Sequence, residues 1–186
     1  ASDMQEPTIA DMSIMDEHIV VESKTRISSI CNNLSVNPGN AVLVKKGSEI
    51  LGVVTAKDIF RAMSEGANAA KLRVDKIMRE EILAIRGDTP LSKGLDKISE
   101  SNPDAIIVVD ESDNFVGYFS LRDYRESTRK LEAYQLMAAR LKRSKSAITE
   151  KIEKEESKSD LLNLLLGGNE DEDDDEVDVP SMISLE

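Results

Sequence analysis

The sequence predicts an α/β (α+β) fold in which two βαββα repeats are followed by a long C-terminal helix and a disordered acidic tail. The first observation is a self-match: residues 40–59 align with residues 104–124, at a spacing of 64 that becomes 65 after one residue inserted in a turn. A repeat of fixed period constrains a fold more strongly than a single motif does. The second observation is that no glycine or proline interrupts the chain between Asp123 and Gly167, which predicts an extended helix.

The first repeat has a local signal for each of its elements. Thr25 is suited to starting a helix, and the residues after it place apolar side chains at the i, i+3, i+4 and i+7 spacing of one buried helical stripe. These side chains are Ile27, Ile30, Cys31 and Leu34. Thr55 follows the last strand and is suited to N-capping a second helix. The expected strands are residues 20–21, 41–44 and 50–54, and a turn at 46–48 closes the last two as a hairpin.

The second repeat carries the same signals in the same order. Thr89 marks a helix start, and Pro90 suits the first helical position, where its missing N–H leaves no partner unsatisfied. Ser120 takes the N-cap position that Thr55 has in the first repeat. The expected strands are residues 84–85, 105–109 and 115–119. The predicted domains are residues 8–66 and 72–126 for the repeats, 127–168 for a helical extension and 169–186 for the acidic tail.

Composition excludes several classes of function. Of the 186 residues, 40% are hydrophobic but only 3% are aromatic, so aromatic platforms for single-stranded nucleic acid are scarce. One cysteine, Cys31, and one histidine, His18, exclude a disulfide framework, a cysteine-rich zinc site and a histidine-based triad within one chain. We therefore expect a non-enzymatic protein with no structural metal, and we expect His18 at the surface. No apolar run reaches the length of a membrane span, and we expect a cytoplasmic location.

Two matched motifs stand where a strand passes into a helix. The glycine that opens each motif permits close approach to the backbone, and the hydroxyl residue lies at a helix N-terminus, which favours phosphate. One helical turn later, a carboxylate can accept two hydrogen bonds from a ribose diol, and Lys57 and Arg122 add positive charge. A single motif would indicate helix capping, but duplication at matching positions favours a ligand. The motifs are Gly52-x-x-Thr55-x-x-Asp58 and Gly117-x-x-Ser120-x-x-Asp123.

With these motifs, residues 8–126 resemble a tandem cystathionine beta-synthase (CBS) domain pair, or Bateman module, whose signature is Gly-hydrophobic-x-Thr/Ser-x-x-Asp/Asn. The resemblance implies that the repeats pack through their sheets about a pseudo-twofold axis and leave two clefts for adenosine-containing ligands. These ligands are AMP, ADP, ATP or S-adenosylmethionine, and whether magnesium accompanies a triphosphate stays open. The resemblance also implies a homodimer. Residues 10–14 depart from the family pattern found at residues 74–78, which affects the outer wall of the first cleft.

The same resemblance assigns a role to each predicted site residue. Asp58 and Asp123 contact ribose, and the glycines of the motifs permit the close approach. Thr55 and Ser120 lie near ribose or phosphate, with Lys57 and Arg122 near phosphate. The implied adenine walls are Ile19 and Ala41 in the first repeat and Leu83 and Ala105 in the second.

The pattern of the C-terminal third indicates binding to another macromolecule rather than catalysis. Its helix carries an apolar stripe that either lies on the repeats or pairs with a second copy. Seven basic and two acidic residues lie between Arg125 and Lys145, which suits a solvated face, RNA or the protein's own tail. A short separate helix is expected at residues 161–166, with a cap at Ser159. Nine acidic residues fall within residues 169–186, and such a run is expected to be disordered.

The sequence is consistent with three functions of different classes. The first is a regulatory protein that senses an adenosine ligand and relays its occupancy to a protein or ribonucleoprotein partner through residues 125–186. The alternative is a CBS scaffold that acts as a ribosome- or RNA-associated stress or dormancy factor and docks through the basic helix and the tail. A third, the regulatory half of an enzyme, predicts co-purification with a catalytic chain.

Overall fold

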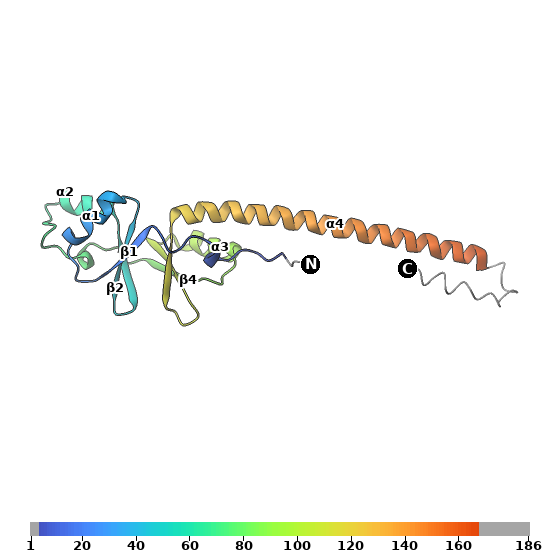
Figure 1. Ribbon diagram of the computed structural model, residues 1–186, viewed down its shortest axis with the longest axis horizontal. Helices are drawn as coiled ribbons and strands as arrows, with labels where there is room; N and C mark the ends of the chain where they lie inside the picture. Colours follow the sequence, from blue (N-terminus) through green and yellow to red (C-terminus); the bar gives the residue numbers. More distant parts are fainter. Residues whose placement is uncertain (1–3, 168–186) are drawn as a thin grey trace. The chain divides into compact units, whose positions relative to one another are not determined.

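The computed structural model describes residues 4–167, which form two three-stranded sheets with helices packed on them and one long C-terminal helix (Figure 1). The sheets have the strand orders β1-β2-β3 and β4-β5-β6, and in each the first pair is parallel and the second antiparallel. The strands are β1 (His18–Glu22), β2 (Ala41–Lys46), β3 (Glu49–Val54), β4 (Ile82–Arg86), β5 (Ala105–Val109) and β6 (Phe115–Phe119). The helices are α1 (Ser28–Val36), α2 (Ala56–Ser64), α3 (Leu91–Ser101) and α4 (Leu121–Gly167).

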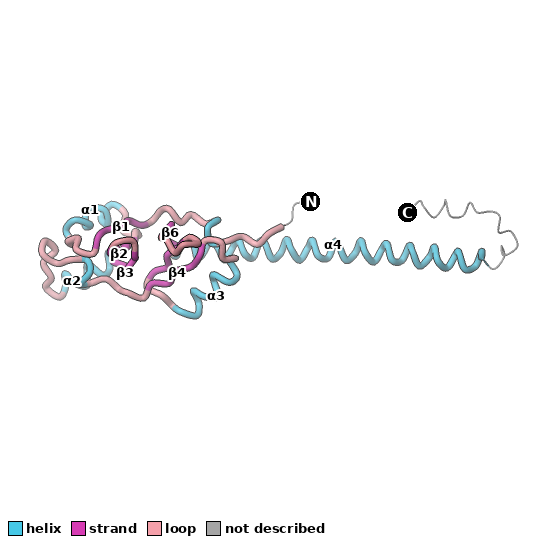
Figure 2. Tube along the Cα trace, turned by 90° about the horizontal axis from the view of Figure 1, so that it is seen from below, coloured by secondary structure: helices cyan, strands magenta, loops and turns pink. Residues whose placement is uncertain are grey.

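The predicted βαββα order is confirmed in both repeats (Figure 2), and the duplication extends to the strand register. His18 pairs with Ala41 in the first sheet, and Ile82 pairs with Ala105 in the second, 64 positions later in each case. Each antiparallel pair also contains a register shift at the equivalent point of its central strand. The start of α4 takes the place in the second repeat that α2 has in the first.

An apolar core lies inside each repeat, and a third cluster joins the two sheets. The joining cluster takes side chains from equivalent positions, Ala41 with Ala105 and Leu43 with Ile107, and none of the four is more than 6% exposed. Packing of equivalent positions against each other is the expected result of a pseudo-twofold axis between the repeats. The predicted packing through the sheets is thereby confirmed. The other members of the cluster are Ile50, Val53 and Val109.

The repeats exchange the short segments that precede their first strands. The 3-10 helix Ile9–Asp11 places Ile9 in the core of the second repeat. The 3-10 helix Val74–Lys76 places Val74 in the core of the first repeat. Because each core is completed by the other repeat, residues 1–135 form one compact unit.

The exchanged segments also account for the glycine of each motif. A Cβ on Gly117 would lie 2.6 Å from the Ile14 carbonyl oxygen. A Cβ on Gly52 would lie 2.7 Å from the Met78 sulfur and 2.9 Å from the Arg79 carbonyl oxygen. The motif predicts that these glycines admit a ligand, whereas in the structure a segment of the protein itself makes the close approach.

Replacing Gly117 with alanine is expected to lower the free energy of unfolding by about 1 to 3 kcal/mol, because the new methyl group overpacks the contact with Ile14. The change also strains the hydrogen bond that the Tyr118 N–H donates to the Ile14 carbonyl at 2.8 Å. Gly39→Ala is the matched control, since no atom lies within 4 Å of its added Cβ. Urea denaturation measures both variants, and equal stability of the two would contradict the clash.

The first helix begins later than predicted. α1 starts at Ser28 rather than at Thr25, because the backbone just before it bonds to the exchanged segment instead. The Val74 N–H donates to the Thr25 carbonyl at 2.8 Å, and the Ile27 N–H donates to the Leu72 carbonyl at 2.9 Å. These tertiary bonds hold residues that a local signal places inside the helix.

The start of α3 also differs from the prediction by one residue. Pro90 is the N-cap, with an extended ψ of 143°, and Leu91 is the first helical residue. The N-terminal segment supplies the acceptors for the first turn: the Leu91 N–H donates to the Pro7 carbonyl at 2.9 Å. The Glu6 carboxylate accepts a hydrogen bond from the Ser92 N–H at 2.9 Å. A distant acidic side chain therefore caps this helix, as the partial positive charge of a helix N-terminus favours.

α4 runs without interruption to Gly167. The predicted continuation of the helix beyond the second repeat is confirmed, and the predicted separate helix at residues 161–166 is wrong. Ser159 and Asp160 lie inside α4, because polar residues without a glycine or proline only weaken a helix and do not end it.

The chain divides within α4 into two compact units, residues 1–135 and residues 136–186. The predicted acidic tail lies outside the described residues. Within residues 4–167, no helix combines the length and the apolar character that crossing a membrane requires.

Candidate functional site

The first motif forms a capping box at the start of α2. The Asp58 carboxylate accepts a hydrogen bond from the Thr55 N–H at 2.9 Å and another from the Thr55 hydroxyl at 3.0 Å. Such a box satisfies backbone donors that the first turn of a helix leaves without partners. Asp58 is only 5% exposed. Helix capping, the structural alternative for this motif, is therefore present here.

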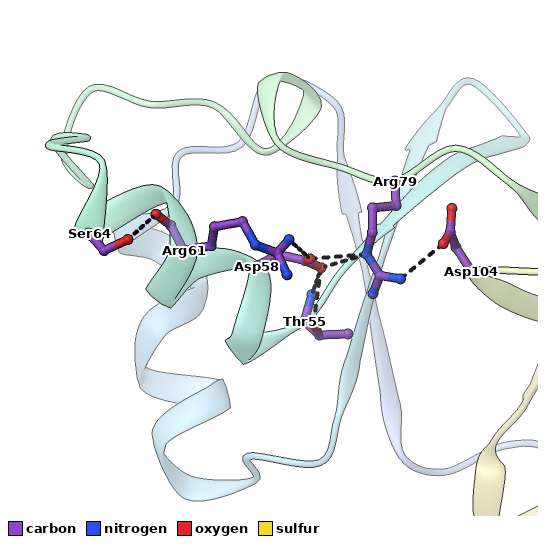
Figure 3. Close-up of polar contacts among 6 residues, drawn as sticks. All are labelled: Thr55, Asp58, Arg61, Ser64, Arg79 and Asp104. Carbon is purple, nitrogen blue, oxygen red and sulfur yellow. Dashed lines mark hydrogen bonds and ion pairs between the residues drawn. The ribbon is translucent and has the colours of Figure 1, made fainter.

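Arg79 occupies the rest of the Asp58 carboxylate (Figure 3). The Arg79 Nε donates to the two carboxylate oxygens at 3.0 and 3.2 Å, and the Arg79 Nη1 donates to Asp104 at 3.0 Å. Arg61 approaches Asp58 from the opposite side, at 3.5 Å. Charge-assisted hydrogen bonds of this kind are stronger than neutral ones. A ribose diol can reach the Asp58 carboxylate only after Arg79 leaves it.

The second motif makes a similar cap at the start of α4 in a different environment. The Ser120 N–H donates to the Asp123 carboxylate at 3.0 Å, and the Asp123 N–H donates to the Ser120 hydroxyl oxygen at 3.1 Å. The Ser120 hydroxyl donates to Glu17 of the other repeat at 2.6 Å. Among residues 4–167, no lysine or arginine forms an ion pair with Asp123. Ile14 holds the position equivalent to Arg79, because its carbonyl accepts from the Tyr118 N–H as the Arg79 carbonyl accepts from the Val53 N–H.

Three carboxylates meet beside the second motif. Oxygen atoms of Asp16, Glu17 and Asp123 lie within 4.8 Å of one another, and Asp123 is 1% exposed. Glu17 has a φ of 60°, a conformation that is uncommon for residues other than glycine. No spacing in the sequence predicts this cluster, because its members come from different repeats. Carboxylate oxygens in this arrangement suit hydroxyl donors or a hard cation such as magnesium.

The electrostatics of the second motif differ from those of the first. Burial raises the pKa of the Asp123 carboxyl above its ordinary value of 3.8, against the lowering effect of the hydrogen bonds from Ser120. The negative charges of Glu17 and Asp16 raise this pKa further. Burial also raises the pKa of the Tyr118 phenol, and the charges of Glu17 and Asp123 add to that effect. The charge of Arg79 opposes the rise at Tyr118. The second motif therefore lies in an acidic environment in which no described lysine or arginine pairs with Asp123.

The raised pKa of Asp123 predicts a pH dependence of stability with a defined sign. In the folded state this carboxyl keeps its proton at a pH where the unfolded chain has released it. Its contribution to stability is therefore present in acid and is lost as the pH rises above the ordinary aspartate range and through the raised pKa. Relative to Asp123→Asn, the wild-type free energy of unfolding should fall as the pH rises above about 4. Urea denaturation over these pH values checks the sign, and a difference that grows with pH in favour of the wild type would contradict it.

The two cations of the motifs are at the surface. Lys57 and Arg122 both lie on the outer side of their helices, and Arg122 lies 3.7 Å from Glu126 on the next turn of α4. Such an exposed pair contributes little to stability, so the Arg122 side chain can reorient toward an anion.

The structure does not gather the predicted adenine walls in pairs. Ala41 and Ala105 are buried together in the cluster that joins the two sheets. Ile19 packs instead on the core of the first repeat, and Leu83 packs on the core of the second. Each predicted pair of walls is therefore divided between two clusters.

His18 is half-buried, so it lies only partly at the surface, where the sequence places it. Its ring centroid lies 5.7 Å from that of Phe115 and 5.7 Å from that of Tyr118. Its Nδ1 lies 2.8 Å from the Asp16 carbonyl oxygen. His18 therefore belongs to the contact between the repeats, next to the acidic residues of the second motif.

A hollow of about 520 Å³ lies beside these acidic residues. Pockets for small ligands commonly measure about 300 to 1,000 Å³. Asp16 lines the hollow, and its carboxylate is within 4.8 Å of the Asp123 carboxylate, so the hollow opens next to the second motif. The lining residues are Ala10, Met12, Ser13, Ile14, Met15, Asp16 and Val116.

Comparison with known sequences identifies the second repeat. A family model described as CBS domain matches residues 74–129. The chain is 29% identical over 84 residues to a homoserine O-acetyltransferase of Methanosphaera stadtmanae and 24% identical over 100 residues to an uncharacterised protein of Methanocaldococcus jannaschii. These matches cover 45% and 54% of this chain but only 16% and 24% of the relatives. The chain thus spans at most a quarter of the length of these two proteins.

Solved structures share the arrangement of both repeats. CBSX2 in complex with AMP has a TM-score of 0.53 and 18% identity, over 68% of this chain and 98% of that chain. The CBS domain of a bacterial CNNM/CorC family Mg2+ transporter in complex with ATP has a TM-score of 0.56 and 19% identity, over 65% and 86%. A CBS domain pair in complex with 5′-methylthioadenosine and S-adenosyl-L-methionine has a TM-score of 0.53 and 20% identity, over 66% and 95%. Residues 74–129 therefore match the CBS domain family, and the two βαββα repeats of the chain have the fold of a CBS pair.

Proposed function

We propose that this protein is a non-enzymatic regulatory protein that senses an adenosine-containing ligand at its second motif. The contrast between the two motif carboxylates carries the proposal: Arg79 holds Asp58, whereas Asp123 is buried with no cation paired to it among residues 4–167. Proteins with this fold are described in complex with AMP, with ATP, and with 5′-methylthioadenosine and S-adenosyl-L-methionine, which supports this class of ligand. In this proposal Asp123 accepts hydrogen bonds from the ribose hydroxyls, and Ser120 lies beside the ribose.

The other roles in the two clefts follow the family signature. In the second cleft, Leu83 and Ala105 flank the adenine and Arg122 lies near a phosphate. In the first cleft the same roles fall to the equivalent residues, and a ligand reaches the Asp58 carboxylate there only after Arg79 has moved. These residues are Ile19, Ala41, Gly52, Thr55 and Lys57.

The negative charge of the second cleft predicts the order of affinity of the ligands. Asp16, Glu17 and Asp123 place three carboxylates within 4.8 Å of one another, and Arg122 is the cation that the motif itself supplies. Like charges at this distance repel, so the cluster favours the cationic sulfonium of S-adenosylmethionine, or a magnesium-bound triphosphate, over a bare phosphate. We expect S-adenosylmethionine to bind more tightly than AMP, with a ratio of affinities that narrows as salt is added.

A relay through α4 follows from the position of Asp123 in the first turn of that helix. A ligand held by Asp123 and Ser120 contacts the element whose later residues form the second compact unit. Such a ligand shifts the population of α4 states only by its difference in affinity between them, and allosteric couplings are typically about 1 to 3 kcal/mol. We propose that a protein or ribonucleoprotein partner reads this shift.

Isothermal titration calorimetry of the full chain tests the proposal. AMP, ADP, ATP with and without magnesium, and S-adenosylmethionine are the ligands to titrate. We expect micromolar binding of at least one of them, about −8 kcal/mol, at one ligand per chain. Absence of heat with all of them, for a protein whose melting shows it to be folded, would contradict the sensor function.

A scaffold that docks on RNA is the second candidate, and the exposed basic residues of α4 favour it. Arg140, Lys142, Arg143 and Lys145 are all exposed on α4. RNA binding by these residues should weaken steeply as salt increases and should be lost when three of them are neutralised. Nucleotide sensing depends on Asp123 instead, so the two functions respond to different variants.

A further inference from the structure

The second compact unit presents apolar side chains that no described residue covers. Every residue from 139 to 167 is exposed in α4. The large apolar residues along one line of the helix are between 42% and 59% exposed, namely Leu141, Ile148, Ile152, Leu162 and Leu166. Helical stability in proteins comes mainly from packing of an apolar face rather than from helix propensity. A partner for this face is therefore required.

The spacing of this face is that of a coiled coil. From Ala138 onward, side chains that alternate at intervals of three and four residues share one line of the helix. Two members of the line are charged, Lys145 and Glu155. These two residues determine whether a partner helix packs parallel or antiparallel. The full line is Ala138, Leu141, Lys145, Ile148, Ile152, Glu155, Ser159, Leu162 and Leu166.

We propose that residues 138–162 pair with the same residues of a second copy of this chain as an antiparallel two-stranded coiled coil. A parallel pair would place Lys145 against Lys145 and Glu155 against Glu155, and two like charges inside the seam are unfavourable. An antiparallel pair can place Lys145 of each copy against Glu155 of the other. That register also places Ile148 against Ile152.

The residue pairs nearer the ends of the coiled coil can also pack in its core in this register. Ala138 faces Leu162, a small residue against a large one, and Leu141 faces Ser159. Charged or polar residues at single core positions are known to set the register and the number of strands in coiled coils, at some loss of stability. The Lys145–Glu155 layers therefore specify the register rather than add strength.

Charge along the whole unit supports the antiparallel orientation. Residues 136–149 contain four basic residues and no acidic one, whereas residues 150–160 contain five acidic and three basic residues. Antiparallel pairing places the basic half of each helix against the acidic half of the other, including Lys142 beside Glu156 at the edge of the seam. Lys151 meets its own copy near the twofold axis, which is the one unfavourable charge contact of this register.

Exchange of the two seam charges tests the pairing. Sedimentation velocity of the full chain is expected to show a dimer for the wild type and at least a tenfold weaker dimer for Lys145→Glu and for Glu155→Lys separately. An equimolar mixture of the two variants should dimerise again, because a mixed pair has opposite charges in both of these seam layers. Lys154→Glu is the matched control, since it makes the same change of charge on the outer face of the helix and should leave the dimer intact.

Cysteine cross-linking in a Cys31→Ser background reads the orientation directly. Leu141→Cys mixed with Ser159→Cys should form a disulfide-linked dimer, whereas neither variant should do so alone. In the antiparallel pair the two copies of residue 141 are about 27 Å apart, at 1.5 Å per residue, and a disulfide needs Cα atoms within about 7 Å. Cross-linking of Ser159→Cys alone would indicate parallel helices and overturn the proposal.

Other occupants of the face give distinct results that also overturn the proposal. A wild-type monomer at about 100 μM, far above the usual dissociation constant of a specific dimer, would leave the face to the protein's own residues 168–186 or to RNA. A dimer unchanged by Lys145→Glu and Glu155→Lys would lie on another surface, such as the repeats.

Discussion

Replacing Asp123 with asparagine is expected to weaken binding of the adenosine ligand by about 100-fold or more. Its carboxylate is proposed to accept two hydrogen bonds from the ribose, and hydrogen bonds to a charged group contribute about 1.5 to 3 kcal/mol each. Asparagine keeps an oxygen that can accept the bond from the Ser120 N–H, which the carboxylate now accepts at 3.0 Å. The variant therefore retains the helix cap and loses the charge. Titration calorimetry with the tightest ligand measures the effect.

Two controls separate this effect from general damage to the protein. Asp96→Asn removes an exposed carboxylate from α3 and should change neither binding nor stability. Asp58→Asn should leave the affinity within about threefold of wild type, since Arg79 already occupies Asp58, although it lowers stability. Loss of binding in Asp58→Asn, with binding kept in Asp123→Asn, would place the ligand in the first cleft and contradict the account.

Replacing Arg79 with methionine is expected to raise the stoichiometry from one ligand per chain to two. Removal of the guanidinium frees the Asp58 carboxylate for a second ribose. The same change should lower the free energy of unfolding by about 1 to 3 kcal/mol. Breaking a fully buried ion pair costs about 3 to 5 kcal/mol, and the Arg79 side chain is 37% exposed, so the expected effect is smaller.

Arg86→Met is the matched control for this prediction. Arg86 pairs with Asp88 at 2.7 Å, and both side chains are largely exposed, so its loss should lower stability by at most about 1 kcal/mol. A weaker affinity of Arg79→Met for AMP, with unchanged affinity for S-adenosylmethionine, would instead make Arg79 a phosphate ligand. That result would contradict the proposal that Arg79 closes the first cleft.

The fold could be predicted because its signals are local and occur twice. The spacing from Thr55 to Asp58 and from Ser120 to Asp123 is short enough for each motif to indicate a strand followed by a capped helix. The helix starts near Thr25 and Pro90 were misplaced because tertiary bonds from Val74 and from Pro7 decide them. Local sequence contains no information on either partner.

The sequence predicts the motif residues of the site, but it does not predict which charged side chains surround each motif carboxylate. Arg79 lies 21 positions from Asp58, and Glu17 lies 103 positions from Ser120. Both contacts arise because the repeats exchange the segments before their first strands, which no periodicity reveals. The two clefts differ because of this exchange, since the segment before β1 carries Ile14 where the segment before β4 carries Arg79. Matching the two repeats position by position already shows that difference, although it does not show which carboxylate the arginine reaches.

A crystal structure of the protein with its tightest ligand tests the central claim most directly. We expect one ligand per chain, with its ribose hydroxyls on the Asp123 carboxylate and with the Arg79 contact to Asp58 intact. A ligand whose ribose lies on Asp58, with Arg79 turned onto its phosphate, would contradict the claim that the second motif is the sensing site.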